Sequence, residues 1–399
     1  MSYQRILSRW ICLVVAMASC AQVHAQQASE KTSAPDAELS RRDPDSPSSN
    51  VLPPEEWQRL DQAVDRSLAW LATQQNSDGS FPTASYGQPG VTSLCLLAFM
   101  ANGHVPGEGP YGNRLDKATR FIMSCQKQNG LVTLNGPDGE QISRDVDDDL
   151  GVTAAYNHAI SSLTLSETYG MARAKRAPEH AKIIDKALAA TLEMQHWKKD
   201  LKADLGGWRY IIDEGENDSD LSITGWQLMF LRSARNAGFN VPQEPIDDAI
   251  KYVRRTFRSK HRTFGYETGQ YANFTRAMAG AGILALAHAG YHNSIEARTA
   301  SEWLLENTCN EYNGSNGVSL DRYHYSLFNS CQGMYQMGSP YWDKFFPPTV
   351  ASLLAHQNPD GSWDAESLQR DRRFGNSYTT SLVALSLAAP NQFLPIFQR

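Results

Sequence analysis

The phrase Gln-Asn-x-Asp-Gly-Ser-aromatic occurs twice in this chain, as QNSDGSF at 75–81 and as QNPDGSW at 357–363. A repeat of this length near both ends of a chain constrains its architecture more than composition does. The Asp-Gly pair favours a tight turn, because glycine tolerates a positive φ. The glutamine can cap a helix end, and the aromatic ring can wedge between neighbouring helices.

Two kinds of helical segment alternate after residue 50. The first kind carries charges and an apolar stripe at spacings of three and four, at 57–75, 115–128, 183–195, 245–258, 295–307 and 346–357. The second kind is apolar or small on nearly every side, as a helix buried all round must be, at 91–102, 154–171, 223–237, 274–289, 323–337 and 377–388. This alternation predicts an all-α fold, an α6/α6 toroid with an outer ring of amphipathic helices and an inner ring of buried ones. An open solenoid of helical repeats is the alternative.

In such a toroid the repeated phrase follows an outer helix and precedes an inner one. Weaker copies occur where Gly206-Gly207-Trp208 follows Gln195 and at 264–266. We therefore interpret the phrase as structural, a staple between helices rather than a site of chemistry. The residues assigned to it are Gln75, Asp78, Gly79, Phe81, Trp208, Gln357, Asp360, Gly361 and Trp363.

The first fifty residues differ from the rest of the chain. Arg5 and Arg9 precede an apolar stretch at 11–18, and Val23-His24-Ala25 ends in the small residue expected before a cleavage site, so 1–25 resembles a signal peptide. Residues 26–50 are polar and rich in Ser and Pro, as in a disordered linker, and 51–399 form the toroid. We expect an exported protein, periplasmic or extracellular. Lipid attachment at Cys20 is the alternative at this end.

Composition excludes several partners. The net charge of −6 and the pI of about 5.9 provide no basic face for nucleic acid, and the apolar run at 11–18 is too short to span a bilayer. Cysteines beyond the signal region have no zinc-finger spacing, and neither their pairing nor the oligomeric state follows from the sequence. They are Cys95, Cys125, Cys309 and Cys331. We expect no metal and no cofactor.

The repeated turns resemble the prenyltransferase and squalene-oxidase repeat of the terpenoid cyclase/protein prenyltransferase toroid superfamily. The resemblance covers residues 55–399. GGWRY at 206–210, HAISSLTLSETYGM at 158–171 and FLPIFQR at 393–399 resemble a squalene cyclase-like group of exported bacterial single-toroid proteins. The resemblance implies a central cavity for a hydrophobic ligand such as an isoprenoid or triterpenoid, although a shared fold does not fix a function.

Class II cyclases of this superfamily protonate an alkene with the middle aspartate of a DxDD motif, and two segments resemble it. Asp145-Val146-Asp147-Asp148 matches the motif literally but precedes the inner helix expected near Ala154. Asp218 and Asp220 follow GGWRY and lead directly into an inner helix, which places Asp220 as the proton donor, but Leu221 replaces the last aspartate. The structural alternative for the first segment is a solvated acidic loop or charge that complements a helix dipole. For the second it is helix capping by Asp220 or Ser222.

Other chemistries of toroids and α/α barrels fit less well. Zinc prenyltransferases need an Asp-x-Cys pair and a later histidine, which Asp321 and His324 do not replace. The Cys-Gly-Glu-Gln thioester motif is absent, since Cys331 is followed by Gln-Gly. A carbohydrate-active barrel uses two carboxylates across a cleft, and the candidates are Asp147, Asp220 and Glu167.

The starts of the inner helices are expected to ring one mouth of the toroid. The side chains expected there are aromatic or polar: Tyr156, His158, Trp226, Arg276, Tyr323, Tyr325 and Tyr378. Such a concave aromatic pocket is the usual form of a ligand site, unless these rings fill the core and His158 is a hydrogen-bonded core histidine. The leading hypothesis is a cavity that binds a hydrophobic ligand. The alternatives are a cyclase-type isomerase with an aspartate acid, a periplasmic scaffold for an unknown protein, and a carbohydrate-active barrel.

Overall fold

The computed structural model describes residues 50–171, 178–213, 218–269, 273–314, 321–367 and 369–399. The expected signal peptide, Cys20 and all of the linker except residue 50 lie outside these ranges. The described chain is helical apart from a small antiparallel sheet, in which β1 (Phe257–Arg258) pairs with β2 (Thr263–Phe264). The prediction of an all-α toroid is confirmed.

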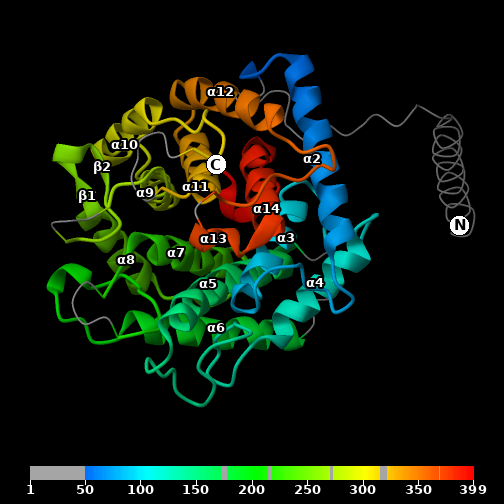
Figure 1. Cartoon of the computed structure of the whole chain (residues 1–399). Coiled ribbons are helices and arrows are strands. Elements are labelled where there is room, and N and C mark those ends of the chain that lie inside the picture. Colours follow the sequence, from blue (N-terminus) through cyan, green and yellow to red (C-terminus); the bar gives the residue numbers. More distant parts are fainter. Residues whose placement is uncertain (1–49, 172–177, 214–217, 270–272, 315–320, 368) are drawn as a thin grey trace, which may run out of the picture. The chain divides into compact units, whose positions relative to one another are not determined.

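The buried helices form a closed inner ring. Its members in the described chain are α3 (Gly90–Met100), α5 (Asp148–Met171), α7 (Leu221–Asn236), α9 (Arg276–His288), α11 (Tyr323–Met337) and α14 (Gly375–Leu387). Each packs against the next in this order, and α14 packs against α3 (Figure 1). This last contact closes the ring, which an open solenoid would lack.

Amphipathic helices surround this ring. They are α2 (Pro54–Gln74), α4 (Gly112–Ser124), α6 (Pro178–Gln195), α8 (Gln243–Thr256), α10 (Ile295–Glu306) and α12 (Tyr341–Ala355), with the short α13 (Gln369–Arg372) before α14. Each buries one stripe, as α8 does with Ala249, Tyr252 and Val253, and keeps its charges outside. Contacts between α12 and α2 bring the last outer helix against the first.

The repeated turns join neighbouring outer helices through the glutamine side chain. Gln75 donates to Gly79 O at 3.0 Å and so holds its own turn. Its amide also donates to a backbone carbonyl of the following outer helix, and three other glutamines do the same. The acceptors are Arg114 O for Gln75, Ile183 O for Gln126, Pro245 O for Gln195 and Ala63 O for Gln357, at 2.7–2.8 Å. Gln126 is a copy of the repeat that the sequence analysis missed.

Glycine is required at the bend of these turns. The glycines have positive φ, 99° at Gly79, 91° at Gly130, 87° at Gly206 and 95° at Gly361. A Cβ atom at any of them would overlap a backbone carbonyl of the neighbouring outer helix. Both the dihedral angle and the close approach therefore exclude larger residues.

Two residues after each glycine, a backbone N–H donates to a side chain of the inner helix. Phe81 donates to Thr92, Trp208 to Thr224 and Trp363 to Thr380, at 2.9–3.0 Å. The turn therefore binds the outer helix, the inner helix and the next outer helix together. This agrees with the structural role expected for the repeat.

The C-terminal segment fills one end of the inner ring, and Figure 1 shows the C-terminus inside it. In this segment lies the short helix η6 (Pro395–Phe397), which packs against α7. Gln336 near the end of α11 donates to Phe397 O at 2.7 Å. Open space remains at the opposite end, where the inner helices begin.

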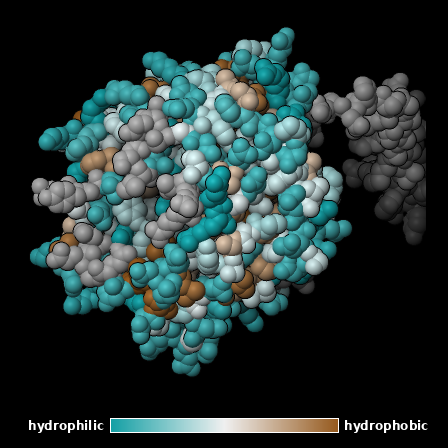
Figure 2. Space-filling model, in the orientation of Figure 1, coloured by the Kyte–Doolittle hydropathy of each residue, from teal (hydrophilic) through white to brown (hydrophobic). Residues whose placement is uncertain are grey.

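The visible surface is mostly hydrophilic, with hydrophobic residues in small scattered patches (Figure 2). Large hydrophobic side chains exposed in the described chain are Leu134, Leu205, Tyr291, Ile295 and Phe393. No helix among the described residues is both long and apolar enough to cross a membrane.

Candidate functional site

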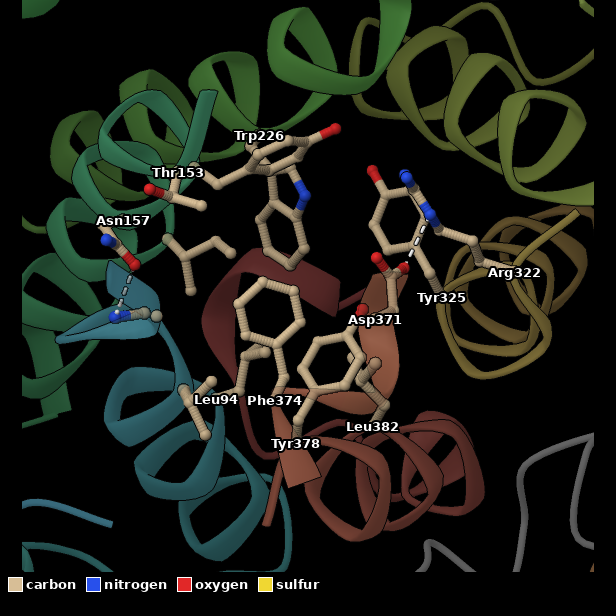
Figure 3. A pocket seen from close by; sticks show the side chains of 15 residues that line it. Leu94, Thr153, Asn157, Trp226, Arg322, Tyr325, Asp371, Phe374, Tyr378 and Leu382 are labelled. Atoms are coloured by element: carbon tan, nitrogen blue, oxygen red, sulfur yellow. Dashed lines mark hydrogen bonds and ion pairs between the residues drawn. The ribbon is translucent and has the colours of Figure 1, made fainter. Parts of the chain in front are cut away.

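A cavity lies among the first turns of the inner helices. The space between its walls is about 640 Å³ when the open mouth is included. Figure 3 shows aromatic rings from three sides of the ring around it. The apolar and aromatic lining consists of Val91, Leu94, Tyr156, Ile160, Trp226, Tyr325, Phe374, Tyr378 and Leu382. Tyr156, Trp226, Tyr325 and Tyr378 were expected here from the sequence, and Phe374 was not.

Packing behind the wall fixes the ring of Trp226. Trp226 is 1 % exposed and stacks on Phe328 of α11, with ring centroids 5.4 Å apart and planes 5° apart. On the opposite side Tyr378 packs against Phe374 at 5.6 Å. The cavity is therefore walled by rigid aromatic faces, which suit an apolar ligand and also stabilise cationic groups.

One side of the cavity is polar. Arg322 Nε lies 2.6 Å from Asp371 Oδ2, and both side chains line the cavity (Figure 3). Burial alone would lower the pKa of Arg322, but the carboxylate of Asp371 and nearby tyrosine hydroxyls raise it, so the guanidinium is charged. Neither residue was expected from the sequence.

The cavity continues into a second, more polar hollow at its mouth. The two share Thr153, Tyr156, Arg322, Asp371 and Phe374. The outer hollow adds Asp148, Val152, Tyr210, Ile212 and Arg373 to its walls. Arg373 is paired with Asp149 at 3.2 Å. The site is thus an apolar chamber under a mouth that carries charges of both signs.

Asp220 lies behind the cavity wall rather than in it. Its side chain is fully buried and caps α7, accepting from Ile223 N at 2.9 Å and from Ser222 Oγ at 2.5 Å. Arg209 Nη1 lies 3.3 Å from Oδ2. Burial raises the pKa of Asp220, and Arg209 opposes that rise.

A hydrogen-bond chain connects Asp220 to the cavity. The hydroxyl of Tyr156, which lines the cavity, lies 2.7 Å from Ser222 Oγ, and Ser222 donates to Asp220. Behind Asp220 the polar network continues, because Arg209 donates to Tyr266 Oη at 3.0 Å and the hydroxyls of Tyr266 and Tyr210 are hydrogen-bonded. Neither Ser222 nor Arg209 was expected from the sequence to connect Asp220 to the cavity.

The other aspartates of the two acidic segments have different surroundings. Asp218 is buried in an ion-pair cluster, 2.6 Å from Arg144 Nη2 and 3.3 Å from Lys199 Nζ. Asp145 and Asp147 are exposed and line neither hollow. Asp148 is exposed at the polar mouth.

The expected start of the second inner helix was wrong. The helix α5 begins at Asp148 rather than near Ala154, and the side chain of Asp147 accepts from Leu150 N at 3.3 Å. The DxDD segment therefore opens an inner helix directly. The carboxylates at a helix start complement its dipole, which accounts for the extra turns.

Three residues expected at the mouth lie elsewhere. His158 Nδ1 accepts a hydrogen bond from Val132 N at 3.1 Å. In the other repeats a threonine of the inner helix accepts the equivalent bond. Arg276 is fully buried and paired with Asp321 at 2.5 Å. Tyr323 donates to Cys309 O at 3.0 Å. Each points away from the cavity because its helix position faces the surrounding layer of turns and outer helices.

The carboxylates considered for a carbohydrate-active site do not come together. Glu167 lies near the last turn of α5, where it accepts from Ser233 Oγ at 2.5 Å and from Ile396 N at 3.4 Å. Burial raises the pKa of Glu167 to about 7. Asp220 is buried and Asp147 is exposed, both at the opposite end of the ring. Among the described residues that line the cavity, Asp371 is the single carboxylate.

The residues considered for metal and cysteine chemistry lie apart in the described ranges. His324 Nδ1 lies 3.0 Å from Glu366, while Asp321 pairs with Arg276, so these residues do not share a centre. No group of three or more potential ligands is placed to hold a metal ion in the part of the chain that is described. Cys95, Cys125, Cys309 and Cys331 are all buried and unpaired.

Comparison with solved structures agrees with the toroid fold. No protein-family model matches this chain, and no curated protein matches its sequence. The type II terpene cyclase MstE from Scytonema has a TM-score of 0.53 at 14% identity, over 84% of this chain and 100% of that one. The glycoside hydrolase family 76 mannosidase Bt3792 from Bacteroides thetaiotaomicron has a TM-score of 0.56 at 11% identity, over 85% and 98%. These similarities establish an α/α toroid fold, the fold implied by the resemblance in the sequence.

Proposed function

We propose that this toroid binds a hydrophobic ligand, of the isoprenoid or triterpenoid kind, in the chamber between its inner helices. The observation that carries the proposal is the ring of aromatic and aliphatic side chains around an unfilled space. Transfer of apolar surface from water into such a chamber is favourable by roughly 0.8 kcal/mol for each buried CH₂ group. An isoprenoid chain has enough apolar surface to gain this transfer free energy.

The polar mouth indicates that the ligand is an amphiphile. A pure hydrocarbon that covered Arg322 and Asp371 would strip water from an ion pair without replacing its hydrogen bonds. An alcohol or carbonyl group placed at the mouth would restore them. The ligand would then lie with its chain among Trp226, Tyr325 and Tyr378 and its polar end near Arg322.

The fold neighbours include a terpene cyclase and a mannosidase, and the carboxylates of this chain favour a hydrophobic ligand over a carbohydrate. One structure of MstE is a complex with geranylgeranyl dihydroxybenzoate as substrate, an isoprenoid chain with a polar head. A glycosidase needs two carboxylates facing a cleft, and here the expected ones are separated. Asp371, the carboxylate of the described lining, is held by Arg322.

Native mass spectrometry with geranylgeraniol as the probe tests the proposal. Leu94→Phe adds volume inside the chamber, whereas Leu205→Phe adds the same ring at a position that is 53 % exposed. We expect the bound species in the unaltered protein and in Leu205→Phe, and its loss in Leu94→Phe. A clean unliganded mass for the unaltered protein, also after incubation with host lipid extract, would remove the ligand hypothesis and favour the protein-scaffold alternative.

A cyclase-type isomerase is the second candidate, and the connection from Tyr156 through Ser222 to Asp220 favours it. Asp220 is a buried carboxyl whose pKa is raised, as an acid must be. In the proposed reaction the proton of Asp220 would reach the ligand through the hydroxyl groups of Ser222 and Tyr156. Incubation with geranylgeraniol should yield a cyclic isomer detectable by gas chromatography with mass spectrometry. Asp220→Asn should abolish formation of the product. The control Asp218→Asn, which alters a buried ion pair, should retain it. Equal activity in both variants would exclude Asp220 as the acid.

We also propose export, on the pattern at residues 1–25. Sequencing of the mature N-terminus after expression with the native leader should give Gln26. A diacylglyceryl mass on Cys20 would instead establish the lipoprotein alternative, and an intact N-terminus would contradict export.

A further inference from the structure

A second hollow lies at the opposite ends of the inner helices from the aromatic cavity. It is formed by the last turns of α7 and α9 and by one face of α8, and its empty volume is about 1440 Å³ with its open mouth included. Four cationic side chains line it, Arg232, Arg235, Lys251 and Arg254, against one carboxylate, Asp247. We refer to this hollow as the basic groove.

Most of this positive charge has no carboxylate partner. Lys251 is paired with Asp248 at 2.8 Å. Arg232, Arg235 and Arg254 form no ion pair within the described ranges. Burial lowers the pKa of Arg232, and the neighbouring positive charge of Arg235 lowers it further because the two guanidinium groups repel each other. Such a cluster, in a protein of net charge −6, is the arrangement that a bound anion would stabilise.

Helix capping explains only part of the cluster. Arg232 donates one N–H to His288 O, as basic residues at helix C-termini do. Arg235 donates to Val241 O at 2.8 Å, to Pro242 O at 3.1 Å and to Gln243 Oε1 at 2.6 Å. A guanidinium has five N–H donors, so both retain free ones. Arg254, on α8, is held over the ring of Tyr291 at 4.4 Å and donates to no described residue. The orientation of the Arg254 side chain toward the groove is therefore not explained by capping of a helix end.

The floor of the basic groove holds a further unsatisfied polar atom. Nε2 of His288 is buried and has no hydrogen-bond partner in the described chain. Around it lie the apolar side chains of Leu228, Ile250 and Ala285. The tautomer that carries the proton on Nε2 would offer this N–H to an anion, whereas the other tautomer would not.

We propose that the basic groove binds a phosphate group. The lining has an excess of three positive charges, which suits a phosphoryl dianion better than a single carboxylate. Guanidinium groups bind phosphate oxygens in paired, parallel hydrogen bonds, and Arg232 and Arg254 approach the groove from different helices. The phosphate belongs either to a free ligand or to a lipid headgroup. This inference is independent of the ligand proposed for the aromatic cavity.

Isothermal titration of the full chain with inorganic pyrophosphate tests this. The double variant Arg232→Gln/Arg254→Gln removes two of the unpaired charges, and Lys117→Gln/Arg120→Gln removes two exposed charges from α4 as a matched control. We expect affinity to fall about tenfold or more in the groove variant and to change little in the control. Absent binding by the unaltered protein, or equal losses in both variants, overturns the proposal.

Vesicles distinguish the two sources of the phosphate. Sedimentation with phosphatidylglycerol in phosphatidylcholine, against phosphatidylcholine alone, is run on the same three proteins. Binding to the anionic vesicles that pyrophosphate competes away, and that the groove variant loses, assigns the phosphate to a lipid headgroup. Pyrophosphate binding without vesicle binding assigns it to a free ligand. Vesicle binding that the groove variant retains contradicts a role for the groove in it.

Discussion

Asp147 and Asp220 cap two inner helices that pack side by side, α5 and α7. Asp147 is exposed and makes one weak hydrogen bond to the start of its helix, at 3.3 Å. Asp220 is 0 % exposed and is bonded by a backbone N–H, a serine hydroxyl and a guanidinium. The same residue type at the same helix position is therefore solvated in one helix and desolvated in the other.

The loop before each helix causes this difference. Asp220 N donates to Trp208 O at 2.9 Å, so the chain around Gly206–Trp208 folds over the start of α7, and Arg209 covers the carboxylate. The chain before Asp147 carries no comparable cover. A carboxyl becomes an acid at neutral pH only when its surroundings disfavour the ionised form. Burial and the cover by Arg209, rather than the match to DxDD, therefore distinguish the two carboxyl groups.

Alanine substitution at the two positions is the strongest test of this contrast. Asp220→Ala leaves Arg209 without its carboxylate in a buried setting and removes the cap of α7, so we expect a loss of about 3–5 kcal/mol in the free energy of unfolding. Asp147→Ala removes an exposed cap and should cost about 1 kcal/mol. Chemical denaturation of both variants measures the difference. Similar losses would mean that burial does not separate the two sites.

A third carboxyl, Glu167 near the other end of α5, extends the comparison to pH. Burial raises the pKa of Glu167 from 4.5 to about 7. The folded protein thus favours the protonated form of Glu167. The contribution of this group to the free energy of unfolding is fully present below pH 4.5 and is lost as the pH rises through about 7. The total loss is about 3 kcal/mol.

Glu167→Gln cannot ionise and should not show this fall. We expect the variant to be the more stable protein above pH 7 and to lose that advantage toward pH 4.5. Unfolding curves from pH 4 to pH 8 measure it, with Glu193→Gln, on the exterior helix α6, as the control. A parallel pH dependence for both variants and the unaltered protein would contradict a buried, protonated Glu167.

Much of the fold followed from the sequence because its signals are local. The glutamine and the glycine with positive φ act within one turn, and helices buried on all sides have an unmistakable composition. Tyr156 and Trp226 could be placed because they fall in the first half of an inner helix. The copy at Gln126 was missed because Val132 replaces the aromatic residue.

The candidate site was less predictable because it depends on the rotation of each helix and on the connections between helices. The helix α5 is apolar or small on every side, so the sequence does not show which side faces the cavity. Residues 156 and 158 differ by about 200° around a helix axis, which is why Tyr156 faces the cavity and His158 faces the turn. Arg322, Asp371 and Phe374 lie just outside the inner helices, in segments with no periodic pattern.

The smallest expected effect concerns the connection between Asp220 and the cavity. Tyr156→Phe removes the hydroxyl that bonds Ser222 and should cost about 1 kcal/mol of stability. Tyr378→Phe is the matched control, since Tyr378 also lines the cavity and its hydroxyl bonds to no described residue. The loss of unfolding free energy in Tyr378→Phe should be near zero.

A double-mutant cycle between Tyr156→Phe and Ser222→Ala then isolates the coupling, because the two variants break the same bond. If the losses in the single variants simply add, Tyr156 and Ser222 are not coupled, and Asp220 has no hydrogen-bonded route to the cavity. A combined loss smaller than the sum establishes the route. In that case the two aspartates differ in their connections as well as in burial: Asp147 caps a helix in water, and Asp220 caps a helix from a position that is hydrogen-bonded to the cavity wall.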